Sequence, residues 1–145
     1  MSIVCESSTK NVKLFFMYRL NRVQMVKLLL ERGADPLKED SNQLLPLHSA
    51  ARRGFAEICS LLLLTDSGVK AVNSTVVNCR NVSPFHLACL SGNRETCELF
   101  LENGADLAMK SATQHTPLHF VAWQGHEKIC EILIGTGNRL FCFNV

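Results

Sequence analysis

Three histidines share one sequence context, which raises the question of whether they bind a metal ion or act as a base. His48, His86 and His119 each stand two residues after a proline. Histidine is the commonest protein ligand for transition metals and a frequent proton acceptor. A zinc ion, however, needs its ligands within about 2 Å, whereas equivalent positions on successive packed helices lie roughly 8–10 Å apart. The pattern therefore indicates structural histidines, and we expect no metal site.

Seven cysteines offer a second kind of chemistry, nucleophilic attack or disulfide formation. Cys59, Cys97 and Cys130 occupy one position of a repeated segment in which an earlier copy has Val26, so the position requires a small apolar side chain. Cys89 likewise replaces an alanine. Neighbouring copies are too far apart for a disulfide, which tolerates a Cα separation of about 7 Å. Nothing arranges a base beside a cysteine, and we expect no catalytic residue.

Composition and cysteine usage limit the classes of protein further. The chain has 145 residues, 47% of them hydrophobic and 19% charged, which is typical of one globular unit. A net charge of +2 is too small for a nucleic-acid binder. No apolar run reaches the roughly 18 residues of a membrane span, so we expect no membrane insertion by this chain. An odd cysteine count without Cys-x-x-Cys spacing favours an intracellular, cytoplasmic setting.

The histidines belong to a repeated unit that begins with a proline. Its copies are Leu45-Pro46-Leu47-His48, Ser83-Pro84-Phe85-His86 and Thr116-Pro117-Leu118-His119. The prolines are 38 and then 33 residues apart, and eight residues after each comes a glycine. Proline suits the first turn of a helix, and glycine suits a left-handed position at its end. The pattern therefore predicts a first helix of about two turns in each copy.

A second helix and an extended loop complete each unit. Apolar residues recur at helical spacing in Glu57 to Leu63, Glu95 to Leu101 and Lys128 to Ile134. From Asp35 of Gly33-Ala34-Asp35 to the motif proline Pro46, and from Asp106 of Gly104-Ala105-Asp106 to the motif proline Pro117, the gap is the same 11 residues. We interpret this fixed gap as a turn and a short extended finger. Gly135-x-Gly137 has no preceding strand and no phosphate-binding Lys, so we expect no cofactor.

These features resemble the ankyrin repeat family, whose period is 33 residues and whose hallmark is Thr-Pro-Leu-His-x-Ala. Thr116 to Ala122 and Leu45 to Ala51 come close to this hallmark, and the resemblance covers Val23 to about Ile134. It implies an all-α ankyrin-repeat solenoid of stacked helix–turn–helix units with short β-like finger loops. It also implies that each histidine hydrogen-bonds locally and braces adjacent loops.

The repeats divide the chain as follows. We expect a non-repeat end at 1–11, repeats at 12–39, 40–77, 78–110 and 111–137, and a non-repeat tail at 138–145. The first repeat is degenerate, because Lys13 and Phe15 replace its proline and histidine; its first helix would be Leu14 to Arg19. The extra residues of the second repeat, within Leu64 to Val77, are interpreted as a tolerated loop. Because solenoid ends need polar caps, the apolar tail suggests a fragment of a longer array.

The resemblance also implies where a protein partner binds. Ankyrin partners usually contact the finger tips and the two positions before the first-helix glycine, on the concave face. The matching positions, here called the finger-side strip, are Arg52, Arg53, Arg80, Val82, Leu90, Ser91, His115, Trp123 and Gln124. We expect Leu90, Trp123 and Val82 to form an apolar centre, since tryptophan often dominates interface energy. Arg19 and the strip arginines would favour an acidic partner segment.

The expected function is therefore a scaffold or adaptor that binds another protein and catalyses nothing. Two alternatives stay open. The chain could be the cytosolic ankyrin region of a cation channel of the ankyrin-type transient receptor potential class, whose irregular linkers the 38-residue spacing resembles. It could also be the recognition module of a larger enzyme, such as a kinase or ubiquitin ligase.

Overall fold

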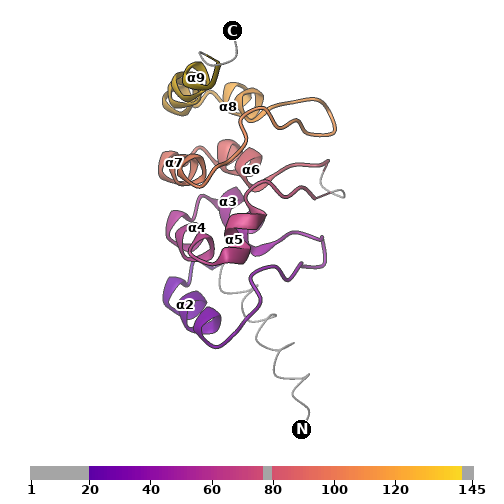
Figure 1. The fold of residues 1–145 in the computed structure, drawn as a ribbon, viewed down its shortest axis with the longest axis vertical. Helices are drawn as coiled ribbons and strands as arrows, with labels where there is room; N and C mark the ends of the chain where they lie inside the picture. The colour runs from indigo at the N-terminus through magenta and orange to yellow at the C-terminus, as the bar shows by residue number, and fades with distance from the viewer. Residues whose placement is uncertain (1–19, 77–79, 142–145) are drawn as a thin grey trace.

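The computed structural model describes residues 20–76 and 80–141. In this part of the chain there are eight helices. They are α2 (Val23–Glu31), α3 (Pro46–Arg53), α4 (Ala56–Leu63), α5 (Asp66–Ala71), α6 (Pro84–Ser91), α7 (Arg94–Glu102), α8 (Pro117–Gln124) and α9 (Glu127–Phe141). Figure 1 shows α2, α4, α7 and α9 stacked in one column, with α3, α6 and α8 in a second column and the finger loops projecting beyond it. The expected all-α ankyrin-repeat solenoid is confirmed.

Proline and glycine set the limits of the first helices. The helices α3, α6 and α8 begin at Pro46, Pro84 and Pro117. Each ends before a glycine in the left-handed region, with φ of 70°, 75° and 72°. A side chain is disfavoured in that region, so glycine stops each helix and turns the chain toward the next one.

The core lies between the two columns. Contacts run from α3 to α6 and from α6 to α8 in the first column, and along α2, α4, α7 and α9 in the second. Large side chains at the centre, such as Leu47, Phe85 and Phe100, are at most 1% exposed. The rings of Phe85 and Phe100 lie 6.2 Å apart and join the two columns within one repeat. Burial of such side chains is the main favourable term in folding.

The insertion in the second repeat is more ordered than expected. The segment from Leu64 to Val77 was interpreted as a loop, but it contains α5. Thr65 caps α5, because its hydroxyl oxygen accepts a hydrogen bond from the Gly68 amide at 2.9 Å. Gly68 packs so closely on the carbonyl of Leu62 that a Cβ would overlap it. The interpretation as a simple loop was therefore wrong.

The last helix is also longer than expected. The second helix of the final repeat was expected to end near Ile134, but α9 continues to Phe141. It thus crosses Gly135 and Gly137 and includes part of the expected tail at 138–145. The expected N-terminal end at 1–11 and the expected helix from Leu14 to Arg19 lie outside the described residues. None of the described helices is long and apolar enough to cross a membrane.

A backbone hydrogen bond joins the last two finger loops. In the last finger the Ser111 amide donates to the His115 carbonyl at 2.9 Å. The Ala112 amide donates to the carbonyl of Arg80, on the preceding finger, at 2.8 Å. Val76 and Val82 form an isolated antiparallel bridge at the base of that preceding finger. The last two fingers are therefore held in register.

Candidate functional site

The finger-side strip is largely accessible. Arg52, Arg53, Arg80, Trp123 and Gln124 are exposed, and Leu90, Ser91 and His115 are half-buried. The residues come from the ends of α3, α6 and α8 and from the fingers beside them. Figure 1 places these segments along one side of the molecule. One protein segment could therefore contact several repeats at once.

Trp123 is the most exposed aromatic residue of the described strip, with an exposed fraction of 63%. Its ring centroid lies 4.5 Å from that of His115, at an interplanar angle of 60°. Its ring also meets Phe120 edge-on at 5.7 Å. Tilted and edge-on contacts of this kind are the favourable arrangement for aromatic pairs. The indole therefore contacts two rings and still offers most of its surface.

His119 extends this group into an aromatic cluster of His115, His119, Phe120 and Trp123. The rings of His115 and His119 are 5.4 Å apart. Each Nδ1 atom lies within hydrogen-bond distance of a threonine hydroxyl: Thr113 at 2.7 Å for His115, and Thr116 at 2.8 Å for His119. These contacts orient both rings. Recognition of the cluster required the tertiary structure, because the sequence alone singled out His115 and Trp123.

Val82 does not belong to the accessible strip. We expected it to form an apolar contact centre with Leu90 and Trp123, but it is only 8% exposed. Its carbonyl accepts a hydrogen bond from the Val76 amide, and its side chain joins the core. The finger turns at Arg80 and Asn81, both with positive φ, and then leads Val82 inward. Arg19, expected at the basic end, lies outside the described residues.

His86 shows the expected bracing role clearly. Its Nδ1 accepts a hydrogen bond from the Ser83 amide at 3.2 Å and lies 2.8 Å from the Ser83 hydroxyl. Nε2 therefore carries the ring proton and faces the carbonyl of His115 at 3.2 Å, across to the next finger. Burial is the main cause that lowers the pKa of His86, and the backbone of His115 and Met109 opposes it. The histidine is neutral and structural.

His48 occupies the same position in the preceding repeat but has a different environment. The residue three positions before it is Leu45, which has no hydroxyl to match Ser83 or Thr116. Among the described residues neither ring nitrogen makes a hydrogen bond of good geometry. Burial lowers the pKa of His48 to about 4, although the nearby backbone of Val82 and Ser74 opposes the shift. The leucine was the signal of this difference, and sequence reasoning missed it.

The described cysteines are structural in the same sense. Cys59, Cys89 and Cys97 are fully buried, Cys130 is half-buried, and all four are free thiols. Burial raises the pKa of Cys59 to about 12. A hydrogen bond with Cys97, followed by burial, raises the pKa of Cys89. The thiolate is the nucleophilic form, so neither Cys59 nor Cys89 is suited to attack a substrate.

The part of the chain that the structure describes holds no set of side chains that could bind a metal ion. No three His, Cys, Asp or Glu side chains gather there in a way that could hold an ion. The paired rings of His115 and His119 are oriented by hydroxyl groups. The arrangement is suited to contact with another molecule through aromatic and polar surface.

Comparison with known proteins agrees with this geometry. A family model described as ankyrin repeats in three copies matches residues 47–141, and one described as ankyrin repeats in many copies matches residues 14–63.

The transient receptor potential cation channel subfamily A member 1 homolog of Caenorhabditis elegans is 30% identical over 118 residues, which are 81% of this chain and 9% of that protein. The human protein of the same name, transient receptor potential cation channel subfamily A member 1, is 27% identical over 122 residues, which are 82% of this chain and 10% of that protein. The E3 ubiquitin-protein ligase KEG of Arabidopsis thaliana is 31% identical over 100 residues, 68% and 6% of the two. The chain spans a tenth or less of the length of these three relatives.

Proposed function

Because this chain belongs to the ankyrin repeat family, we propose that it is an intracellular scaffold that binds a partner protein along the finger-side strip. Ankyrin repeat domains are in general interaction modules without catalytic activity of their own. The support for the strip is its accessibility together with its firm attachment to the core. The last two fingers, which a backbone hydrogen bond joins, present a surface that loses little entropy on binding.

The observation that carries this proposal is the exposure of Trp123 together with its contacts to neighbouring rings. A tryptophan that is 63% exposed and in contact with two rings combines a large contact area with a restricted orientation. Tryptophan is enriched among interface residues whose truncation costs about 2 kcal/mol or more. His115 and Gln124 beside it offer hydrogen-bonding groups at the rim. We therefore place the centre of the interface at Trp123.

The arginines extend the interface toward the N-terminal side. Arg52 and Arg53 end α3 and are exposed, as is Arg80 on the next finger. None of the three makes an ion pair with a described residue. Unpaired guanidinium groups bind carboxylates in bidentate fashion. An acidic segment in the partner, aligned across α3 and the fingers, fits this distribution.

The test is affinity capture of partners by the tagged chain, followed by titration of the recovered partner against purified variants. We expect Trp123→Ala to weaken the partner's affinity more than about tenfold. Leu64→Ala is the matched control, because Leu64 is 79% exposed but follows the last residue of α4, away from the strip. A Trp123→Ala effect below tenfold would count against this interface.

A second candidate is the ankyrin region of a cation channel, and the similarity to two channel proteins favours it. The similarity to a ubiquitin ligase favours a recognition module of an enzyme instead. The neighbouring coding sequence separates these candidates. Six hydrophobic spans beyond this segment indicate a channel, and a kinase or ligase domain indicates an enzyme. In both cases the finger-side strip keeps its proposed binding role.

A further inference from the structure

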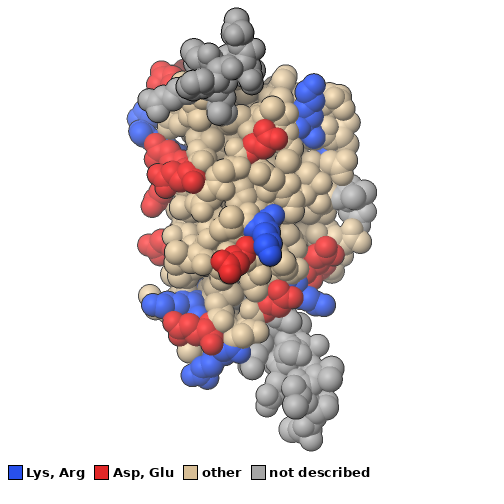
Figure 2. Space-filling model, viewed as in Figure 1, with Lys and Arg blue, Asp and Glu red and all other residues tan. Residues whose placement is uncertain are grey.

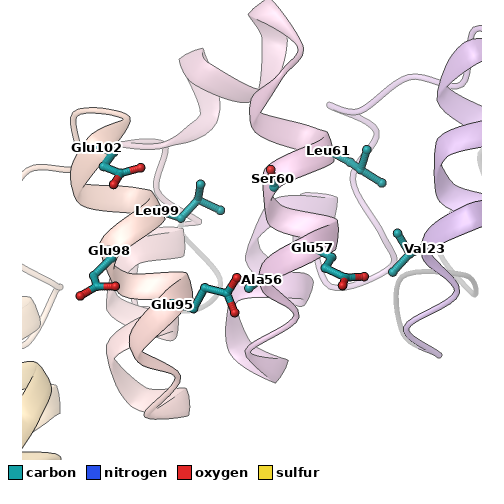
Figure 3. Close-up of a pocket in the computed structure, with 9 residues that line it drawn as sticks. All are labelled: Val23, Ala56, Glu57, Ser60, Leu61, Glu95, Glu98, Leu99 and Glu102. Carbon is teal, nitrogen blue, oxygen red and sulfur yellow. The ribbon is translucent and has the colours of Figure 1, made fainter.

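A groove with a volume of about 440 Å³ lies between the second helices α2, α4 and α7. We call it the second-helix groove. Figure 1 shows that these helices form the column farthest from the fingers. In Figure 3 Leu61 and Val23 face one another between α4 and α2. Together with Leu99 on α7 they are half-buried, so the groove offers apolar surface without being filled by the chain's own core.

Four glutamates line the same groove, Glu57 on α4 and Glu95, Glu98 and Glu102 on α7. Glu98 is paired with Arg94 at 2.8 Å. The other three are exposed and make no ion pair with a described residue. Figure 3 shows the Glu95 carboxylate extending from α7 toward α4. The apolar surface is therefore bordered by carboxylates whose charge is not neutralised within this part of the molecule.

The acidic character belongs to this face and not to the whole chain. The formal net charge is +2, yet the three helices that border the groove, α2, α4 and α7, together carry five glutamates, one arginine and one lysine. On the finger side, α3 ends with Arg52 and Arg53. Figure 2 shows acidic groups along the edge of the molecule where α7 lies in Figure 1. Such a surface repels phosphate backbones and anionic lipids and attracts cationic groups.

We propose that the second-helix groove binds a cationic amphipathic helix of a partner protein. Apolar side chains of that helix contact Leu61 and Leu99, and flanking Lys or Arg side chains face Glu57, Glu95 and Glu102. Helix binding of this kind combines an apolar stripe with charges at its border. The site goes beyond the finger-side strip because it uses the opposite face. The chain would then join an acidic partner on one face to a basic partner on the other.

The test uses a labelled synthetic helix with leucines on one face and lysines on the other, titrated with the purified chain in fluorescence anisotropy. One control peptide carries Glu in place of every Lys, and another carries Ser in place of every Leu. We expect either control peptide to bind about tenfold more weakly or worse, because each removes one of the two complementary features. Equal binding of the Glu peptide would overturn the proposal.

Variants of the chain locate the site. The triple variant Glu57→Gln, Glu95→Gln, Glu102→Gln removes three charges from the groove. The matched control Glu39→Gln, Glu127→Gln, Glu131→Gln removes three exposed glutamates that lie outside the three groove helices; Glu127, like Glu57 and Glu95, stands in the first turn of its helix. We expect the groove variant to bind the Lys peptide at least about fivefold more weakly and the control variant to stay within about twofold. Similar weakening by both triples shows only general charge attraction and overturns the site.

Two further measurements separate this site from its alternatives. Trp123→Ala should leave the affinity for the Lys peptide unchanged, so failure of the finger-side proposal does not affect this one. Sedimentation of the chain alone tests whether a second copy occupies the groove, since Arg52 and Arg53 of one copy could meet the glutamates of another. Self-association that the groove triple abolishes would replace the foreign helix by a second copy and overturn the proposal as stated.

Discussion

At the scale of single residues, one hydroxyl distinguishes two histidines that share a sequence position. Ser83 supplies an amide and a hydroxyl to His86, whereas Leu45 supplies no hydroxyl to His48. His48 is fully buried without a well-formed hydrogen bond among the described residues. Unsatisfied buried polar groups cost stability. The repeat motif thus fixes the position of the histidine, and the residue three positions before it decides how well the ring is satisfied.

The hydroxyl contacts can be tested by a matched pair of variants. We expect Ser83→Ala to lower the free energy of unfolding by about 1–2 kcal/mol, because Ser83 is 1% exposed and caps α6. Thr116→Ala removes the equivalent contact to His119, which is exposed, so its cost should be below about 1 kcal/mol. Urea unfolding of both variants measures the difference. Equal costs would contradict the role assigned to burial.

The low pKa of His48 predicts a loss of stability in acid. The folded state holds the pKa of His48 at about 4, below its ordinary value of 6.5, because burial disfavours the charged ring. The stability gained from a neutral ring is complete above pH 6.5 and is lost as the pH falls toward 4. The full difference is on the order of 3 kcal/mol. Urea unfolding between pH 7 and pH 4 should show a shallower dependence for His48→Gln than for the unmodified chain.

At the scale of elements, the glycine that ends a first helix is constrained by its own backbone conformation and, in one repeat, also by packing against the next repeat. Gly92 and Gly125 end α6 and α8 with nearly the same φ, 75° and 72°. The His126 ring lies against Gly92, whereas nothing lies within 4 Å of a Cβ at Gly125. Conformational strain is therefore similar at both sites, but only Gly92 is constrained by the packing of the next repeat.

This difference predicts unequal costs for two otherwise identical substitutions. Gly125→Ala should cost about 1 kcal/mol of unfolding free energy, since it introduces only a side chain at positive φ. Gly92→Ala should cost at least about 2 kcal/mol, because its Cβ also displaces His126. Chemical denaturation of both variants provides the measurement. A larger cost at Gly125 would contradict the packing seen at α6.

At the scale of the whole molecule, the repeats form one continuous stack with two unlike faces. Helix contacts run without a break from α3 through α6 to α8, and from α2 through α4 and α7 to α9. The stability of such an array is approximately the sum of unit and nearest-neighbour terms. The finger side carries exposed arginine and aromatic groups, and the second-helix side carries the glutamates. The two columns of helices therefore keep a basic and aromatic surface apart from an acidic one.

Continuity of the stack predicts one cooperative thermal transition. Far-UV circular dichroism reports all repeats, and Trp123, the single tryptophan, reports the last one. We expect both signals to share one midpoint, because neighbouring repeats are coupled. Phe85→Ala in the middle repeat should lower both midpoints together, at a cost of about 3–5 kcal/mol. Separate transitions for the two signals would show that the repeats unfold independently.

Features that depend on local conformation were predictable from the sequence. The prolines that begin α3, α6 and α8, the glycines that end them and the small buried residues of the second helices all follow from backbone preference and spacing. The repeat of these signals also predicted the solenoid and the structural role of its histidines. The tertiary structure alone determined that Val82 is buried, that α5 forms within the expected loop, that His48 lacks a good partner and that α4 and α7 border a groove. The burial of Val82 in the core and the groove between α4 and α7 come from the packing of repeats against one another. For α5 and His48 the deciding neighbours, Leu62 and Leu45, are close in sequence, but how they meet depends on how the chain packs around them.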